Sequence, residues 1–390
     1  ELSHLADFCV QTALDDCYQA AVRRYGPPLS PDGIPEQLIV LGMGKLGAYE
    51  LNLSSDIDLI FFYTHQGTLR FEQNGHAQTI SFQEFFISLA RQLISHLDDA
   101  GSIDNVFRVD MRLRPYGGSG PLVVHRAAME KYYLEQGRDW ERYAFIKARA
   151  IAGDLEGGRD FLSWLRPFVY RRHQDYSAVQ SLREMKGLII SQIELNEMSH
   201  DLKLGPGGIR EIEFIAQAHQ LIWGGKHPEL QKPELIQVLE SLVEKEFLPV
   251  EEVSALKEAY VFLRNSEHVV QAEFDRQTHL LPGDEVSQGR LADAMGYDDY
   301  DCYLVALEAH RTRVSQLFAQ LVSTRGTSPH QDIEEVWLNR WKSPANQHVE
   351  ELRLEVRRLQ LDDGVIACLD ELMPRLLMLI GESAAPEVAM

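Results

Sequence analysis

The sequence predicts an α+β fold that is mostly α overall, in which a small mixed-sheet head is followed by a long helical-bundle body. Two apolar stretches in the first part of the chain have the length of buried strands and flank a glycine-rich turn. From Ala127 onward apolar residues recur at helical spacing, with breaks at "LGPGG", "GGKHP" and "LLPGD". With 390 residues, 45% of them hydrophobic and 25% charged, the chain can form two or three domains with their own cores.

The head is expected to start with a helix and then to alternate between strands and helices. The first 26 residues form an amphipathic helix that "GPPLSPDGIP" ends. "EQLIVLGMG" and "DIDLIFFY" are buried strands, and "KLGAYELNL" between them is a helix of about two turns. We expect a polar loop to about Thr79, a helix in "SFQEFFISLARQLISHLDD" after a serine cap, and a strand in "VFRVDMRLRP" that ends at Pro115.

The chain is expected to divide into four regions. A helical lead-in occupies residues 1–35, and an α+β core occupies residues 36–126. A helical body covers residues 127–325 and contains a glycine-rich loop at 204–208. Residues 326–390 form a linker and C-terminal helices, because "GTSPHQD" is rich in turn-forming residues.

The composition argues against several classes of protein. No stretch approaches the roughly 18 apolar residues of a membrane span, and "ELSHLADFCV" lacks a Met, a basic segment and a cleavage site. We therefore expect a soluble, cytoplasmic protein without a membrane partner, cut from a longer chain. The cysteines show no paired spacing, which favours buried reduced thiols over disulfides or a zinc site. They are Cys9, Cys17, Cys302 and Cys368.

The charge of the chain is unevenly distributed. A net charge of -21 argues against nucleic acid as a partner, because binding to phosphate backbones requires a basic surface. Residues 101–210 contain 17 of the 38 basic and 14 of the 59 acidic residues, a balance of +3 against -24 for the remainder. A locally basic segment suits a small anionic ligand, although exposed helix faces would give the same count.

A glycine pattern follows the first expected strand. Gly42, Gly44 and Gly47 spell GxGxxG, which is typical of dinucleotide-binding turns. In that fold the ribose-binding acid lies about 20 residues further on, whereas Asp56 and Asp58 open the next strand. The helix between the strands is also shorter than the dozen or so residues of a parallel crossover. The context therefore disfavours dinucleotide binding.

Two aspartates at the start of the second strand are the first candidates for chemistry. Residues i and i+2 of a strand point to the same face, so Asp56 and Asp58 converge. Two close carboxylates repel each other unless a cation lies between them. Their hard oxygens favour magnesium, with manganese as a second possibility, over zinc. The alternative is that both cap a turn and stay solvated, and on spacing alone that alternative is the more frequent one.

Further residues point to the same chemistry. Asp110 lies in an expected strand that could run beside the first aspartates and add a third carboxylate. Three arginines alternate with it at a period of two: Arg108, Arg112 and Arg114. On one face with Asp110 they would hold phosphate oxygens by bidentate contacts. Together with the turn at Gly44 and Lys45, which offers backbone N–H groups to an anion, the set indicates phosphoryl or nucleotidyl transfer.

At this point the motifs resemble a family. A glycine turn, a short helix, "SSDIDLIF" and a later strand aspartate resemble the nucleotidyltransferase superfamily of DNA polymerase beta. Over roughly residues 15–325, four longer strings are similar to the bifunctional glutamine synthetase adenylyltransferases of bacterial nitrogen control. They are "LGMGKLGAYELNLSSDIDLIFFY", "FRVDMRLRPYGGSGPLV", "YYLEQGRDWERYAFIKARAIAGD" and "KLGPGGIREIEF". The resemblance implies that the head is a nucleotidyltransferase core.

The family carries two catalytic halves, and this chain has one. "SSDID" and "GGIREIEF" are more similar to the amino-terminal, adenylyl-removing half than to the transferring half, which usually has "GSDLDL". That half has further sequence before the point where this chain begins. Ser54 and Ser55 stand where the superfamily usually has a Gly-Ser pair that grips phosphate.

Two further motifs allow either a functional or a structural interpretation. In "KLGPGGIREIEF", Lys203 or Arg210 would bind phosphate and Glu211 or Glu213 would aid metal or base chemistry. Alternatively, the two acids only complement the dipole of the following helix. In "GRDWERYAFIKARA", the arginines either bind anions or pair with neighbouring acids on a solvated face, and Trp140 and Tyr143 are expected in the core. These arginines are Arg138, Arg142 and Arg149.

The resemblance implies a reaction and its partners. Phosphate would attack the adenylyl-tyrosine of glutamine synthetase to give ADP and free tyrosine, with Asp56, Asp58 and Asp110 holding magnesium. The PII signal protein is implied as a regulator. The alternatives are ATP-dependent adenylylation of glutamine synthetase, or a regulatory module that binds a nucleotide or PII without chemistry.

Overall fold

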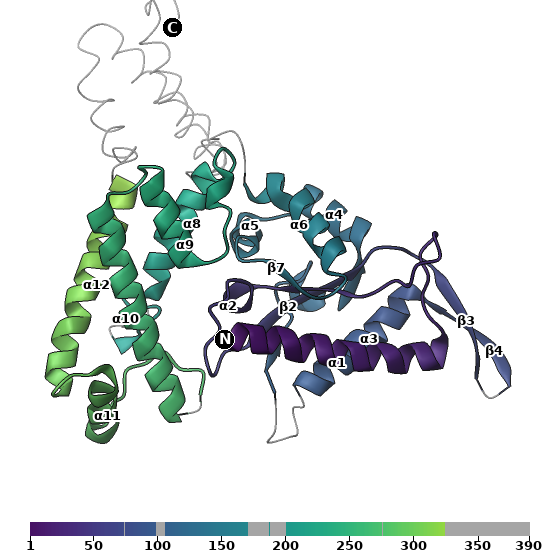
Figure 1. Cartoon of the computed structure of the whole chain (residues 1–390), viewed down its shortest axis with the longest axis horizontal. Coiled ribbons are helices and arrows are strands. Elements are labelled where there is room, and N and C mark those ends of the chain that lie inside the picture. The colour runs from purple at the N-terminus through teal and green to yellow at the C-terminus, as the bar shows by residue number, and fades with distance from the viewer. Residues whose placement is uncertain (74, 99–105, 171–186, 188–199, 275, 324–390) are drawn as a thin grey trace, which may run out of the picture. The chain divides into compact units, whose positions relative to one another are not determined.

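The computed structural model describes residues 1–73, 75–98, 106–170, 187, 200–274 and 276–323 (Figure 1). Residues Glu1–Phe318 form one compact unit, in which a mixed sheet with its helices comes first and a helical body follows. This arrangement confirms the predicted α+β class. The expected linker and C-terminal helices at 326–390 lie outside the described residues.

A five-stranded mixed sheet forms the centre of the head. Its strands are β1 (Ile39–Gly42), β2 (Ile57–Tyr63), β5 (Val109–Asp110), β6 (Val123–His125) and β7 (Arg149–Gly153). The order is β5-β2-β1-β7, and β6 pairs with the later part of β2. β1 is antiparallel to both neighbours, whereas β5 and β6 run parallel to β2. Because β1 and β2 are antiparallel, the GxGxxG turn between them does not belong to a parallel dinucleotide-binding unit.

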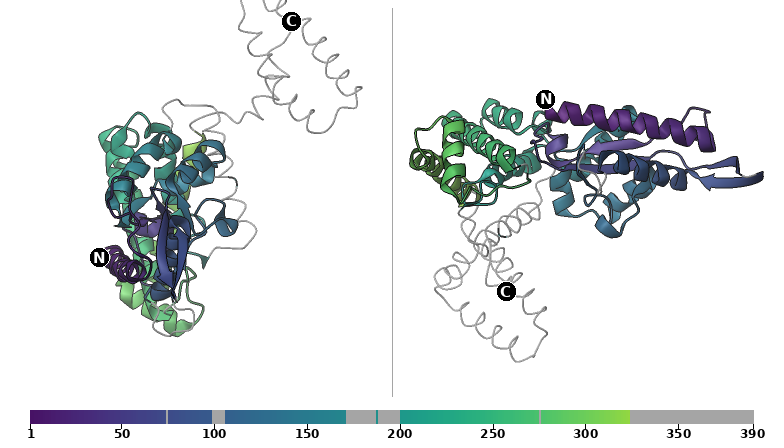
Figure 2. Two further views of the ribbon diagram at one scale, coloured as in Figure 1. Left: turned by 90° about the vertical axis from the view of Figure 1, so that its right-hand side faces the viewer. Right: turned by 90° about the horizontal axis from the view of Figure 1, so that it is seen from below.

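Helices cover both faces of this sheet. Helices α1 (Leu2–Tyr25) and α3 (Phe82–Leu97) pack on the face that carries Leu59 and Phe61 (Figure 2). Residues of three other helices pack on the face that carries Ile60 and Phe62. These helices are α4 (Arg126–Glu135), α5 (Asp139–Phe145) and α6 (Leu155–Val169). Since Asp58 shares the face of Ile60, it lies at the end of the α4–α6 side of the sheet.

The helical body follows the head. It consists of α8 (Ile209–Trp223), α9 (Leu235–Glu244), α10 (Val250–Phe274), α11 (Glu285–Met295) and α12 (Tyr300–Ser323). Most side chains of α8 are buried, and α10 contacts α8, α9 and α11. Among the described residues, no helix has the length and apolar character needed to cross a membrane.

The prediction of a polar loop before Thr79 is wrong. A hairpin of β3 (Thr68–Gln73) and β4 (His76–Ser81) occupies this segment and projects from the head (Figure 2). The Tyr25 and Phe71 rings meet edge to face at 4.9 Å, which anchors the hairpin on α1. An Asn-Gly pair between alternating residues is a strong hairpin signal, so the sequence contained the information. The serine cap that follows is confirmed, because Ser81 Oγ accepts a hydrogen bond from Glu84 N at 3.2 Å.

Other expected elements differ in extent. The helix after the glycine turn is a single turn, α2 (Gly44–Gly47). The strand expected up to Pro115 ends at Asp110, because its carboxylate accepts the backbone N–H of Arg112 and turns the chain. The segment after Ala127 is not nearly all helix, since β7 returns to pair with β1. The four domain boundaries themselves stay a prediction.

Buried ion pairs join the head to the helical body. Lys147, which follows α5, donates to Glu50 Oε2 at 2.8 Å and to Glu213 Oε1 of α8 at 2.6 Å. Glu267 of α10 is fully buried and lies 2.7 Å from Arg264 and 3.2 Å from Lys45. We refer to these charged side chains as the junction network. Because its charges are buried and paired, the loss of one partner would leave another uncompensated.

We predict that Phe62→Ala lowers the free energy of unfolding by about 3–5 kcal/mol. Phe62 is 0% exposed in the central strand, and its ring centroid lies 4.8 Å from that of Phe161. Urea titration of the whole chain measures the change. The matched control is Phe8→Ala on α1, because Phe8 is 67% exposed and its loss should change the free energy by less than about 0.5 kcal/mol. Equal losses in both variants would contradict the assigned core.

We also predict that Glu213 contributes to acid unfolding. Burial alone would raise the pKa of Glu213, but the charge and hydrogen bond of Lys147 lower it to about 2. A carboxyl with a lowered folded pKa adds stability above its unfolded pKa, and this stability is lost as the pH falls from about 4.5 to about 2.

The variant Glu213→Gln tests this contribution. The wild type should lose roughly 3 kcal/mol more than Glu213→Gln between these two pH values. Urea titrations at a series of pH values compare the two proteins. Parallel stability curves over this range would contradict the role of the Lys147 ion pair.

Candidate active site

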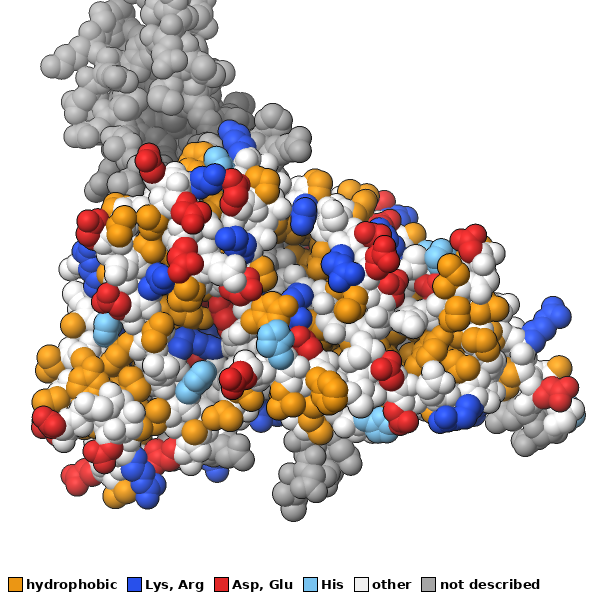
Figure 3. Space-filling model, viewed as in Figure 1, with side chains coloured by type: hydrophobic (Ala, Val, Ile, Leu, Met, Phe, Trp, Pro, Cys, Tyr) orange, Lys and Arg blue, Asp and Glu red, His pale blue; other side chains and the backbone are white. Residues whose placement is uncertain are grey.

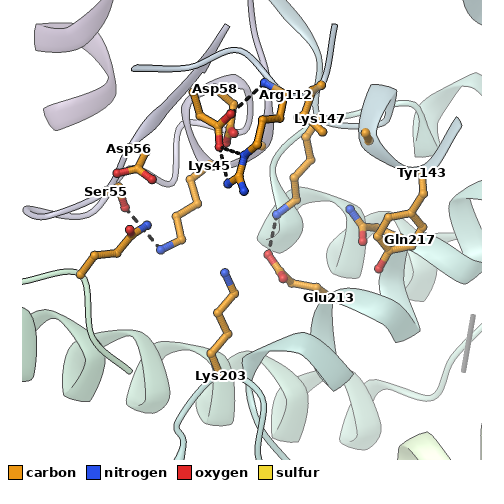
Figure 4. Close-up of a pocket in the computed structure, with 15 residues that line it drawn as sticks. Lys45, Ser55, Asp56, Asp58, Arg112, Tyr143, Lys147, Lys203, Glu213 and Gln217 are labelled. Carbon is orange, nitrogen blue, oxygen red and sulfur yellow. Dashed lines mark hydrogen bonds and ion pairs between the residues drawn. The ribbon is translucent and has the colours of Figure 1, made fainter. Parts of the chain in front are cut away.

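A cavity of about 320 Å³ lies between the beginning of β2 and helices α5 and α8 (Figure 4). Acidic, basic and aromatic side chains from both the head and the helical body line it. On the face of the molecule shown in Figure 3, acidic and basic side chains are interspersed among hydrophobic ones. The cavity is therefore identified by the residues that line it and not by a charged patch on that face.

Three carboxylates line one side of the cavity. Asp58 and Asp110 are register partners on the adjacent parallel strands β2 and β5, and Asp56 precedes Asp58 by two residues. Burial first, and then the charges of Asp110 and Asp56, raise the pKa of Asp58 to about 6. The strand register thus brings together the three acids that the sequence pattern singled out.

Arginines partly neutralise these acids. Arg108 Nε donates to Asp56 Oδ1 at 2.7 Å, and Arg112 Nε donates to Asp110 Oδ2 at 2.7 Å. Although burial raises the pKa of Asp110, the hydrogen bonds and charge of Arg112 lower it below its ordinary value. The arginines therefore compensate two of the three negative charges, while Asp58 is held among like charges.

The acids fit a divalent cation by their chemistry. They offer hard oxygen donors, and the repulsion that raises the pKa of Asp58 is the kind that a bound cation relieves. Within the described part of the chain, however, no three potential ligands form a group suited to a metal ion. The arginine contacts of Asp56 and Asp110 account for this, because those carboxylates are oriented toward guanidinium groups.

Three lysines face the acids. Lys45 donates to Ser55 Oγ at 3.3 Å and to Glu267 Oε1 at 3.2 Å, and burial lowers its pKa to about 8. Lys147 is held by its two glutamates in the junction network. The ammonium of Lys203 has no ion-pair partner among the described residues, and Figure 4 shows it pointing into the space between Lys45 and Glu213. This end of the cavity can receive an anion.

An aromatic side chain and an amide side chain form the far end of the cavity. Tyr143 of α5 and Gln217 of α8 lie together, opposite Asp56 in the view of Figure 4. The Tyr143 ring lies 6.4 Å from that of Phe214 between centroids. Tyr143 and Trp140 were expected in the core. Tyr143 packs against the core and also lines the cavity, whereas Trp140 is 44% exposed.

Two glycines allow the turn to approach this site closely. A Cβ on Gly44, whose φ is +53°, would lie 2.7 Å from Asp58 Oδ2. A Cβ on Gly47 would lie 1.7 Å from the carbonyl oxygen of Lys147. The glycine pattern therefore reflects close packing of α2 against the carboxylates and against the chain after α5.

Several predicted residues do not line the cavity. The expected alternation of the arginines with Asp110 ends with β5, and the Arg114 guanidinium donates to the carbonyls of Met111, Gly118 and Gly120. Ser54, Arg210 and Glu211 also lie outside the lining. Ser54 is buried and its carbonyl accepts from Arg108. Buried Glu211 accepts from Ser315 Oγ at 3.3 Å.

The arginines of "GRDWERYAFIKARA" have structural contacts. Arg142 pairs with Asp139 at 3.0 Å and donates to two backbone carbonyls at the end of α6. Arg149 pairs with Asp7 at 2.8 Å and stacks on the Tyr49 ring. Both arginines thus form ion pairs, but the expected solvated face is wrong, because Arg142 is buried and the partner of Arg149 is not a neighbouring acid.

Sequence reasoning missed other members of the site. Lys147 lies within "GRDWERYAFIKARA", and Gln217 comes three residues after "KLGPGGIREIEF", but neither was predicted as a site residue. The helical spacing of four residues between Glu213 and Gln217 places both on one face of α8, which was a usable signal. Glu267 was not detectable, because it meets Lys45 across 222 positions of the chain.

A second cavity, of about 470 Å³, lies beside the loop at residues 30–37. Its buried acid, Glu36, already accepts hydrogen bonds from the backbone N–H groups of Thr64 and His65 and lies 2.7 Å from His65 Nδ1. The convergence of acids with an uncommitted lysine distinguishes the first cavity as the candidate active site.

Two family profiles match the chain. The profile described as Glutamate-ammonia ligase adenylyltransferase matches residues 1–164. The profile described as GlnD PII-uridylyltransferase matches residues 183–322. The first match covers the sheet and its helices, and the second covers most of the described helical body.

The chain is also similar to curated proteins named bifunctional glutamine synthetase adenylyltransferase/adenylyl-removing enzyme. The relative from Nitrosococcus oceani is 45% identical over 414 residues, covering 99% of this chain and 42% of the relative. The relative from Hahella chejuensis is 42% identical with the same coverage. The relative from Pseudomonas aeruginosa is 49% identical over 83% of this chain and 33% of the relative. The chain thus spans less than half the length of these relatives, and it belongs to the glutamate-ammonia ligase adenylyltransferase family, as its motifs predicted.

Proposed function

We propose that this chain removes AMP from an adenylylated tyrosine of glutamine synthetase, with inorganic phosphate as the attacking group. The observation that supports this most is the convergence of Asp56, Asp58 and Asp110 with the uncommitted ammonium of Lys203 in one cavity. Converging carboxylates suit a metal-assisted reaction at phosphorus, and an available lysine suits an anionic second substrate. The relatives bear a name that includes adenylyl removal.

The proposed reaction is a single displacement at phosphorus. An oxygen of inorganic phosphate forms a bond to the adenylyl phosphorus as the bond from that phosphorus to the tyrosine oxygen breaks. The products are ADP and a tyrosine phenolate, which takes up a proton. Because both reactants are anions, the site must reduce their repulsion and align them.

The residues of the cavity have distinct roles in this proposal. Asp56, Asp58 and Asp110 would hold magnesium or manganese, which when bound would neutralise phosphate oxygens. Lys203 binds the attacking phosphate. Lys45 adds positive charge beside it, because its pKa of about 8 keeps most of its ammonium protonated at neutral pH.

The direction of the reaction rests on motif identity. "SSDID" and "GGIREIEF" resemble the removing half of the family more than the transferring half. The principal alternative is adenylyl transfer from ATP, for which the same carboxylates would serve. A module that binds a nucleotide or the PII signal protein without chemistry is less well supported, because such a pocket does not require converging carboxylates.

We predict that the chain produces ADP from adenylylated glutamine synthetase only when magnesium and phosphate are both present. Phosphate is required because it supplies the attacking oxygen and becomes part of the product. Chromatography of the released nucleotides measures ADP and AMP separately. A parallel reaction contains unmodified glutamine synthetase and labelled ATP, and no label should appear on the synthetase.

Two outcomes of this assay would contradict the proposal. AMP released in phosphate-free buffer would indicate hydrolysis, so phosphorolysis would be rejected. Label transferred from ATP to the synthetase would assign the chain to the transferring activity.

We predict that Asp58→Asn lowers the rate of ADP formation by roughly 100-fold or more, as is typical when an electrostatic group at a reacting phosphate is removed. The thermal midpoint should stay the same or rise, because the substitution removes a buried like charge next to Asp56 and Asp110. The matched control is Asp160→Asn on α6, an exposed carboxylate outside this cavity, which should retain wild-type activity. Near-normal activity of Asp58→Asn would remove this aspartate from the mechanism.

A further inference from the structure

Gln217 is a buried polar side chain at the edge of the candidate active site, and it has no partner among the described residues. The residue is only 4% exposed and lines the cavity. Its carboxamide makes no hydrogen bond within the part of the chain that the structure describes. Buried amides are rarely left unsatisfied, so a ligand or water must complete the hydrogen bonding of Gln217.

The surroundings of Gln217 differ from the rest of the cavity. Glu213, one turn earlier on the same face of α8, is already held by Lys147 at 2.6 Å. Tyr143 lies beside Gln217 in Figure 4, and the apolar side chains of Leu113 and Ala144 also line the cavity. An uncommitted amide beside an aromatic and apolar wall has the properties of a site for a flat heterocycle with a polar edge.

The position of this wall fits the geometry of a nucleotide. In Figure 4, Asp56 and Asp58 lie on one side of the cavity and Tyr143 and Gln217 on the other, with Lys203 between them. A nucleotide whose phosphorus lies at the carboxylates would therefore place its base against Tyr143 and Gln217.

We propose that Gln217 determines the base specificity of the site by hydrogen bonding to adenine. Its amide oxygen accepts from the exocyclic 6-amino group, and its amide N–H donates to the neighbouring ring nitrogen, while the base lies against the Tyr143 ring. A carboxamide matches the adjacent donor and acceptor of adenine. This inference rests on the proposed adenylyl chemistry and names the residue that recognises the adenylyl group.

The names of the two family profiles direct attention to the helical body as the region that would select the base. The profile that covers the head is named for an adenylyl transferase, whereas the profile that covers residues 183–322 is named for a uridylyl transferase. Gln217 lies in the second region. A residue of the body that contacts the base would select the nucleotide without altering the carboxylates of the head.

The test compares ADP with purine riboside 5′-diphosphate, which lacks only the 6-amino group. Calorimetric titration of the full 390-residue chain with magnesium should show about tenfold weaker binding of the analogue, because the amide oxygen loses its donor. In Gln217→Met, which keeps the length of the side chain, ADP should bind about as weakly as the analogue, so the ratio falls to about one.

The control is Gln220→Met on the same helix. Gln220 is 2% exposed, and its amide donates to the carbonyls of Leu230 at 2.7 Å and Lys232 at 2.8 Å, outside the cavity. This variant should have a lower thermal midpoint and an unchanged ratio of ADP to analogue binding. The ratio therefore separates base recognition from the general effect of removing a buried amide.

Each outcome decides the proposal. A wild-type ratio near one, a ratio that persists in Gln217→Met, or a lack of ADP binding would overturn it. The phosphate-dependent assay is a separate measurement. Formation of ADP by a wild type with a ratio near one rejects only the base site, whereas a tenfold ratio without ADP formation rejects the proposed reaction and supports the base site.

Discussion

The ion pairs of Lys147 with Glu50 and Glu213 are the contact on which the geometry of the cavity depends. Glu50 precedes the carboxylate loop, Lys147 follows α5, and Glu213 lies on α8, so one ammonium joins three distant segments. Glu50 also accepts the backbone N–H of Leu235 at the start of α9. Because these charges are buried, the loss of any one of them leaves another unpaired, which typically costs about 3–5 kcal/mol. The network thus specifies one placement of α8 against the sheet.

The same constraint explains the electrostatics of the site. Three acids can lie close together because Arg108 and Arg112 compensate two of them, and the third, Asp58, is left with a raised pKa. Beside these acids, Glu267 holds Lys45 in place, whereas Lys203 has no ion-pair partner among the described residues. The cavity therefore keeps its charges in fixed positions without neutralising all of them, which is the preorganisation that the proposed reaction between anions requires.

The sequence was sufficient where the signal is local. Alternation placed Asp56 and Asp58 on one face at the start of a buried strand, and a capping pattern placed the start of α3 at Ser81. It was insufficient where a residue's role depends on a distant partner. The contact of Arg149 with Asp7 spans 142 positions and that of Glu267 with Lys45 spans 222, and no local periodicity encodes either. The hairpin was missed although its Asn-Gly turn was present in the sequence.

The head and the helical body contribute different kinds of side chain to the cavity. The carboxylates stand on and before strands of the sheet, where register fixes their spacing, whereas Lys203, Glu213 and Gln217 come from the helical body. Lys203, Glu213 and Gln217 take no part in the strand pairing that places the carboxylates, so a substitution at one of them can alter the cavity wall without changing strand register. The two family profiles divide the chain in a similar way, since one matches residues 1–164 and the other residues 183–322.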